Sequence, residues 1–91
     1  MVSEVIKKDG TTEAFDASKI RGAIRAAAEG AGHEEKRVEE IVEKVGIAVI
    51  GAVTEKEKIT TREIRAITLD KLDEVAPAVS SAWRAHDAEK S

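Results

Sequence analysis

The spacing of hydrophobic residues predicts two elements in the first third of the chain. Apolar positions flank an Asp9-Gly10 pair, which is typical of a β-hairpin because glycine readily adopts the positive φ that a tight turn requires. Further along, apolar residues recur three and four positions apart, which predicts an amphipathic helix with Asp16 as its N-cap. We therefore expect a hairpin over residues 2–15 and a helix over residues 17–30.

The longest periodic segment predicts a second helix over residues 34–53. Its apolar residues keep the helical spacing throughout, and after Val45 the segment is apolar on nearly every side. A helix that is apolar all round is normally buried, so we expect it to cross the middle of the domain. Gly46 and Gly51 would allow a neighbouring element to approach it closely.

Local signals predict two more helices in the remainder of the chain. Thr60 and Glu63 have the spacing of a capping box, which predicts the start of a helix over residues 61–75. Pro77 then predicts a fourth helix, over residues 77–88, because proline is tolerated in the first turn of a helix.

The order of these elements predicts an α+β fold. A small N-terminal hairpin would cover a four-helix bundle. Ile59 and its β-branched neighbours suggest a short third strand, which would stabilise a hairpin that is marginal by itself. Because 91 residues are enough for one small domain, we expect a single domain over residues 1–91.

Composition excludes several functional classes. The net charge of −3 argues against a general nucleic-acid binder. The chain has no cysteine, which excludes disulfides, and His33 and His86 lack metal-ligand spacing, so no protein metal site is expected. No apolar stretch approaches membrane-spanning length, and no catalytic motif is recognisable. We expect a cytoplasmic protein that is neither an enzyme nor membrane-bound.

Three lysines gather around the hairpin of this acidic chain. Alternate residues of a strand share a face, so we expect Lys7 on one face and Lys8 on the other. Lys19 falls in the first turn of a helix, where free N–H groups and the helix dipole favour an anion such as phosphate. Glu13 is placed to accept a hydrogen bond from an exocyclic amine. An ordinary solvated turn would also explain these lysines.

Two stretches resemble the ATP-cone family. Residues 5–27, VIKKDGTTEAFDASKIRGAIRAA, are similar to its opening signature of a hydrophobic pair, two basic residues, Asp-Gly, Glu and a later Lys-Ile. Residues 59–72, ITTREIRAITLDKL, are similar to a later family stretch. ATP cones are nucleotide-sensing regulatory modules of ribonucleotide reductases and of a repressor of their genes. The resemblance implies that ATP or dATP binds under the hairpin as an allosteric effector, accompanied by magnesium.

The resemblance also implies which residues contact the nucleotide. Glu13 and Asp16 match positions near the adenine, whereas Lys19, Thr61 and Arg65 match positions near the phosphates. The full set of matched positions is Val5, Lys7, Lys8, Glu13, Asp16, Lys19, Ile20, Thr61 and Arg65.

The fourth helix departs from the family pattern. It keeps Ser81, Trp83 and Arg84 but has alanines where an earlier aromatic residue and arginine would fall. We expect Trp83 to anchor the core rather than to stack on a base. The departure leaves open a degenerate cone that serves as a protein-interaction or oligomerisation module. A small DNA-binding regulator is a weaker alternative, because the chain lacks the Cys-rich zinc ribbon of the family's repressor. A protein partner or self-association is expected.

Overall fold

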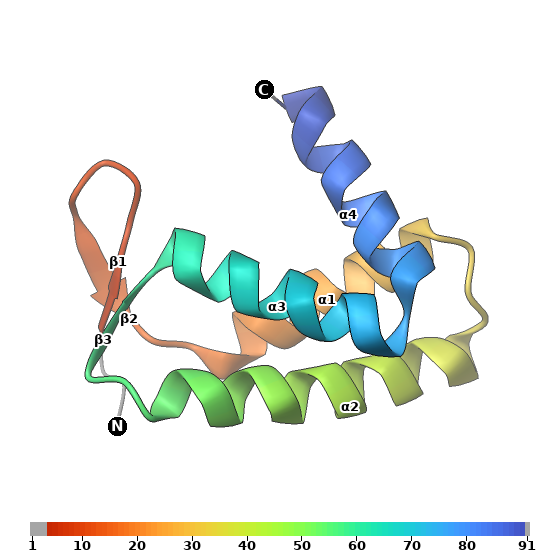
Figure 1. The fold of residues 1–91 in the computed structure, drawn as a ribbon, viewed down its shortest axis with the longest axis horizontal. Helices are drawn as coiled ribbons and strands as arrows, with labels where there is room; N and C mark the ends of the chain where they lie inside the picture. The colour runs from red at the N-terminus through yellow and green to blue at the C-terminus, as the bar shows by residue number, and fades with distance from the viewer. Residues whose placement is uncertain (1–3, 91) are drawn as a thin grey trace.

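Four helices and a small three-stranded sheet form an α+β structure (Figure 1). This computed structural model describes residues 4–90, and side chains up to residue 86. In chain order the elements are β1 (Glu4–Ile6), β2 (Thr12–Ala14), α1 (Ala17–Gly30), α2 (Glu35–Thr54), β3 (Lys58–Thr60), α3 (Thr61–Val75) and α4 (Pro77–Lys90). The predicted fold class and third strand are confirmed, while residues 2 and 3 of the predicted hairpin lie outside the described residues.

The sheet connects the hairpin to the helical bundle. Its strand order is β2-β1-β3, with β1 antiparallel to β2 and parallel to β3. Val5 is the central residue of this arrangement, because it pairs with Glu13 on one side and with Ile59 on the other. Since β3 runs directly into α3, this pairing brings the start of α3 beside the hairpin.

The hairpin turn is longer than a two-residue turn. The Lys7 amide donates to the Thr11 carbonyl at 2.7 Å, and the Gly10 amide donates to the Lys7 carbonyl at 2.9 Å. Gly10 has a φ of +88°, as predicted, and Asp9 accepts hydrogen bonds from the amide and hydroxyl of Thr11. Because β1 ends before Lys7, Lys8 lies in the turn. The prediction that strand alternation orients Lys8 is therefore wrong.

Side-chain caps fix the starts of α1 and α3. The Oδ1 atom of Asp16 accepts a hydrogen bond from the Ser18 amide at 2.9 Å, so the predicted N-cap of α1 is confirmed. Thr60 and Glu63 form the predicted capping box, in which each side chain accepts from the other residue's amide. These caps fix the first turns of α1 and α3, which contain Lys19 and Thr61.

The hydrophobic core is built from aliphatic side chains of all four helices and of β1 and β3. Its fully buried members include Ile24, Ile41, Ile59, Leu72 and Val79. Helix α2 lies along one side of the structure (Figure 1), and Ile47 on it is 58% exposed. The prediction of a central α2 is therefore wrong, because one side of the helix packs on the core while the other, with Glu43, Lys44 and Ile47, is exposed. No helix in the described part of the chain could cross a membrane.

The glycines of α2 do not serve a close helix contact. A Cβ added to Gly46 would lie 3.5 Å from Cγ of Arg21, which is an ordinary van der Waals distance, and one added to Gly51 would meet nothing within 4 Å. The expectation that these glycines allow close approach is therefore wrong.

Candidate functional site

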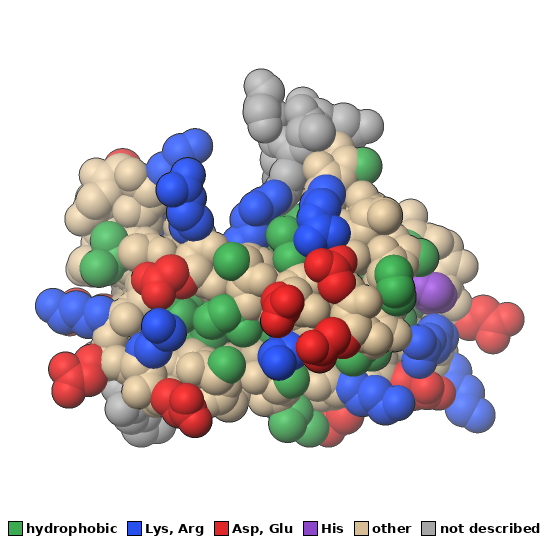
Figure 2. Space-filling view, viewed as in Figure 1, with side chains coloured by type: hydrophobic (Ala, Val, Ile, Leu, Met, Phe, Trp, Pro, Cys, Tyr) green, Lys and Arg blue, Asp and Glu red, His purple; other side chains and the backbone are tan. Residues whose placement is uncertain are grey.

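A cavity of about 290 Å³ lies where the hairpin, α1, α3 and α4 meet. This volume is near the lower end of the range of small-molecule sites, about 300–1,000 Å³. The cavity is lined by Val5, Glu13, Ala14, Phe15, Asp16, Lys19, Ile20, Ala23, Thr61, Ile64, Arg65, Thr68 and Trp83. Figure 2 shows a notch between the hairpin and α4 with Lys and Arg side chains on its flanks.

The cavity brings together most of the residues that the sequence predicted. The lining includes Val5, Glu13, Asp16, Lys19, Ile20, Thr61 and Arg65 from three separate segments. Lys7 does not line the cavity but contacts the lining residue Glu13. Lys8 lies in the exposed turn and is not part of the lining. The pairing of β1 with β3 explains this convergence, because it sets the start of α3 next to the hairpin and α1.

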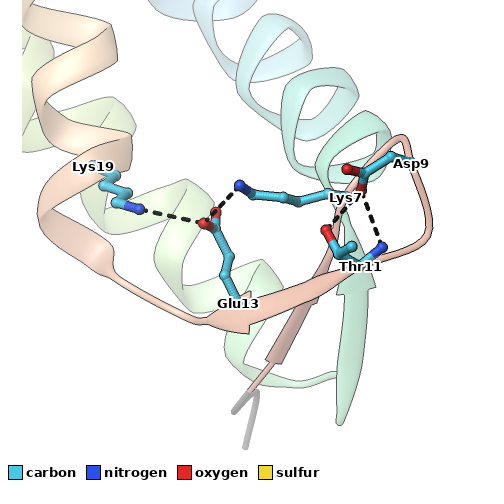
Figure 3. A network of polar contacts seen from close by, with 5 residues as sticks. All are labelled: Lys7, Asp9, Thr11, Glu13 and Lys19. Carbon is cyan, nitrogen blue, oxygen red and sulfur yellow. Dashed lines mark hydrogen bonds and ion pairs between the residues drawn. The ribbon is translucent and has the colours of Figure 1, made fainter.

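Glu13 brings two lysines to one carboxylate oxygen. Its Oε2 atom is 3.4 Å from Nζ of Lys7 and 3.5 Å from Nζ of Lys19 (Figure 3). Lys7 directly follows β1 and Lys19 lies in the first turn of α1, so this contact ties the hairpin to the helix. An anion with several oxygens, such as a phosphate chain, offers the same lysines more acceptors than one carboxylate does.

Asp16 has a structural task at the edge of the cavity. Its Oδ1 atom accepts from both the hydroxyl and the amide of Ser18, at 2.6 and 2.9 Å. These hydrogen bonds, the hydroxyl first, and the charge of Lys19 hold the pKa of Asp16 below its usual value. Asp16 is therefore ionised, and its Oδ1 atom caps α1. Only its Oδ2 atom would be available to accept a hydrogen bond from a bound base.

Helix α3 lines the cavity with residues spaced three and four apart. Thr61 and Arg65 lie four residues apart at its start, so they share a face. Ile64 and Thr68 continue the same wall, and sequence analysis missed both for the site. Thr68 is only 1% exposed, and its hydroxyl donates to the Ile64 carbonyl at 2.7 Å. That hydrogen bond allows a threonine to occupy a buried position.

Both aromatic residues of the chain line this cavity. The sequence contains one Phe, one Trp and no Tyr, and Phe15 and Trp83 are both partly buried in the cavity wall. Trp83 packs against the core, as predicted, and also faces the cavity. Phe15 was not predicted as a site residue, although it lies in the sequence between the predicted site residues Glu13 and Asp16, which could have indicated it. Flat aromatic side chains are suited to contact a planar base.

The sequence matches the family model of the ATP cone domain over residues 3–88. The chain belongs to the ATP-cone family. This match covers nearly the whole chain, so the resemblance seen in the sequence is confirmed. None of the curated proteins matches the chain in sequence. As a member of this family, the chain is a nucleotide-binding regulatory module. The ATP cone is a regulatory domain and not a catalytic one.

Proposed function

We propose that this ATP cone binds ATP or dATP in the cavity and passes the signal to a protein partner or an attached domain. The observation that supports the proposal most directly is the composition of one cavity. It combines both aromatic side chains of the chain with cationic and hydroxyl groups from α1 and α3. A nucleotide requires this combination, because its base is flat and apolar on its faces while its phosphates are anionic.

The cations and the hydroxyl are the proposed phosphate contacts. Lys19 lies in the first turn of α1, where the helix dipole also favours an anion. Arg65 and Thr61 approach from α3 on one face, and Lys7 contacts the lining residue Glu13. Lys8, in the exposed turn, remains a predicted contact of a nucleotide under the hairpin.

The apolar wall is the proposed site of the adenine base. Val5 and Ile20 lie in the lining beside Phe15, so the base would be enclosed by aliphatic and aromatic groups. Glu13 and Asp16 are carboxylate acceptors in the same lining. The exocyclic amine of adenine can donate to such an acceptor, whereas the keto oxygen of guanine cannot.

Magnesium is proposed to enter with the nucleotide. Among the side chains that the structure describes, up to residue 86, no three His, Cys, Asp or Glu form a group that could hold a metal ion. Magnesium is commonly bound through substrate phosphates and water, with few protein ligands. The ion would therefore offset phosphate charge, with Lys19 and Arg65 supplying the protein's share of positive charge.

Isothermal titration calorimetry with ATP, dATP and GTP tests the proposal. We expect ATP and dATP to bind and GTP to bind clearly more weakly. Arg65→Ala should weaken ATP binding, whereas Arg62→Ala removes an equal charge from the same helix outside the cavity lining and serves as the matched control. Absence of ATP and dATP binding would contradict the proposal and favour an interaction module. Equal binding of GTP would contradict adenine selection by the carboxylates.

A further inference from the structure

Three polar side chains link α3 to α4 beyond the cavity. The carboxylate of Asp73, near the end of α3, accepts two hydrogen bonds from the guanidinium of Arg84 in α4, both at 2.9 Å. Its Oδ1 atom also accepts from the hydroxyl of Ser80 at 2.5 Å. We refer to Asp73, Ser80 and Arg84 as the α3–α4 clasp.

The hydrogen bonds of the clasp fix the orientation of α4 relative to α3. Arg84 binds both carboxylate oxygens, and a two-pronged contact of this kind fixes orientation as well as distance. Ser80 is 1% exposed, and its hydroxyl oxygen also lies 2.9 Å from the Pro77 carbonyl oxygen. Hydrogen bonds from Arg84, and then from Ser80, lower the pKa of Asp73 to about 2. The carboxylate is therefore ionised throughout the physiological pH range.

The clasp lies next to the cavity wall along α4. Trp83 directly precedes Arg84, and it is the residue through which α4 contributes to the cavity lining. Helix α4 begins after the turn at Ala76 and rises away from the other helices (Figure 1). A helix attached mainly at its first turns can change its angle, and any such change moves the indole of Trp83. Arg84 and Ser80 are four residues apart, so both fix the same face of α4.

We propose that Asp73 is a positioning residue for the nucleotide site, which holds α4 through Ser80 and Arg84 so that Trp83 forms the base-contacting wall. The proposal rests on the proposed function, because it assigns the aromatic wall to the base. It predicts a selective effect. Loss of the clasp should weaken contacts with the base and leave contacts with the phosphates, which come from α1 and α3, unchanged.

The test compares Asp73→Asn with Asp70→Asn for binding of ATP and of inorganic tripolyphosphate. Asparagine keeps the shape of Asp73 but removes its charge and its second strong acceptor, and Asp70 is an exposed carboxylate of the same helix. Because a displaced Trp83 would lose part of its stacking on the base, ATP binding should weaken about tenfold in D73N. Tripolyphosphate affinity should stay unchanged, and D70N should match the parent for both ligands.

Trp83 supplies a second readout that needs no nucleotide. It is the only tryptophan of the chain, so its fluorescence reports on the cavity wall. D73N should make Trp83 more accessible to acrylamide, and Arg84→Gln, which breaks the clasp from the other side, should do the same. Circular dichroism checks that each variant is folded.

Several outcomes would overturn the positioning role. An equal loss of ATP and tripolyphosphate affinity in D73N would mean that Asp73 acts through net charge or global stability. Unchanged ATP affinity would mean that the clasp does not set the site. Absence of ATP binding by the parent protein would refute the proposed function instead. In that case, acrylamide quenching that is the same in D73N, R84Q and the parent would still refute the positioning role.

Discussion

Replacement of Lys19 by alanine tests the phosphate half of the proposed site. The Lys19 side chain is 66% exposed, and its Nζ is 3.5 Å from Oε2 of Glu13. A hydrogen bond that involves a charged group contributes about 1.5–3 kcal/mol, and exposure to solvent places Lys19 near the lower value. Because about 1.4 kcal/mol corresponds to a factor of ten in affinity, we expect Lys19→Ala to bind ATP about tenfold more weakly than the parent.

The same substitution should leave the fold nearly unchanged in stability. Loss of the exposed ion pair with Glu13 costs at most about 1 kcal/mol. Removal of a cation from the first turn of α1 relieves an unfavourable interaction with the helix dipole of about 0.3–1 kcal/mol. These effects oppose each other, so the free energy of unfolding should change by less than about 1 kcal/mol in urea denaturation.

Calorimetry with ATP decides the outcome for Lys19. Lys44→Ala is the control, because Lys44 is an exposed lysine of α2 that does not line the cavity. The reasoning would be refuted if Lys19→Ala bound ATP as tightly as the parent. It would also be refuted if Lys44→Ala lost affinity equally, since the effect would then come from net charge.

Two further predictions concern the hairpin and the α3–α4 clasp. The hairpin strands have three residues each, so amides of residues 4–15 should exchange rapidly and slow when ATP binds, with α2 protected in both states. Unchanged hairpin exchange at saturating ATP would exclude ordering of the hairpin by nucleotide. Because the pKa of Asp73 is lowered from 3.8 to about 2, its stabilising interactions persist above 3.8 and are lost as pH falls through about 2. In acid unfolding followed by Trp83 fluorescence, the parent should lose the stability that ionised Asp73 provides as the pH falls from 3.8 to about 2. Asp73→Asn should show no such loss over that range.

Much of the secondary structure could be predicted because its signals are local. The Asp16 N-cap, the Thr60 capping box and Pro77 each mark a helix start through the chemistry of a few neighbouring residues. The place of α2 could not be predicted in this way. An apolar run indicates burial, but only the packing of the other helices decides which side stays open to water, and Ile47 lies on that side.

The candidate site was predictable where it follows a family motif and not where it depends on distant packing. The residues matched around the hairpin and the start of α3 converge on the cavity because β1 pairs with β3. The residues around Ile59 predicted a third strand, but its parallel pairing with β1 joins segments far apart in sequence and has no local signal. Thr68 was missed because a threonine on an apolar helix face looks like a solvated residue until its bond to the Ile64 carbonyl is seen. The contact of Trp83 with the cavity likewise depends on the angle of α4.

The position of the two aromatic residues at the cavity is not what core packing alone would favour. A domain of this size gains most when its largest apolar side chains are fully buried. Here the largest fully buried side chains are Ile24, Ile41, Ile59 and Leu72, whereas Phe15 and Trp83 are only partly buried beside the cavity. The fully buried core is therefore aliphatic, and the aromatic rings pack at its edge. Their exposed faces lie in the cavity that Lys19 and Arg65 also line. A nucleotide requires this combination, because its base is flat and apolar on its faces and its phosphates are anionic.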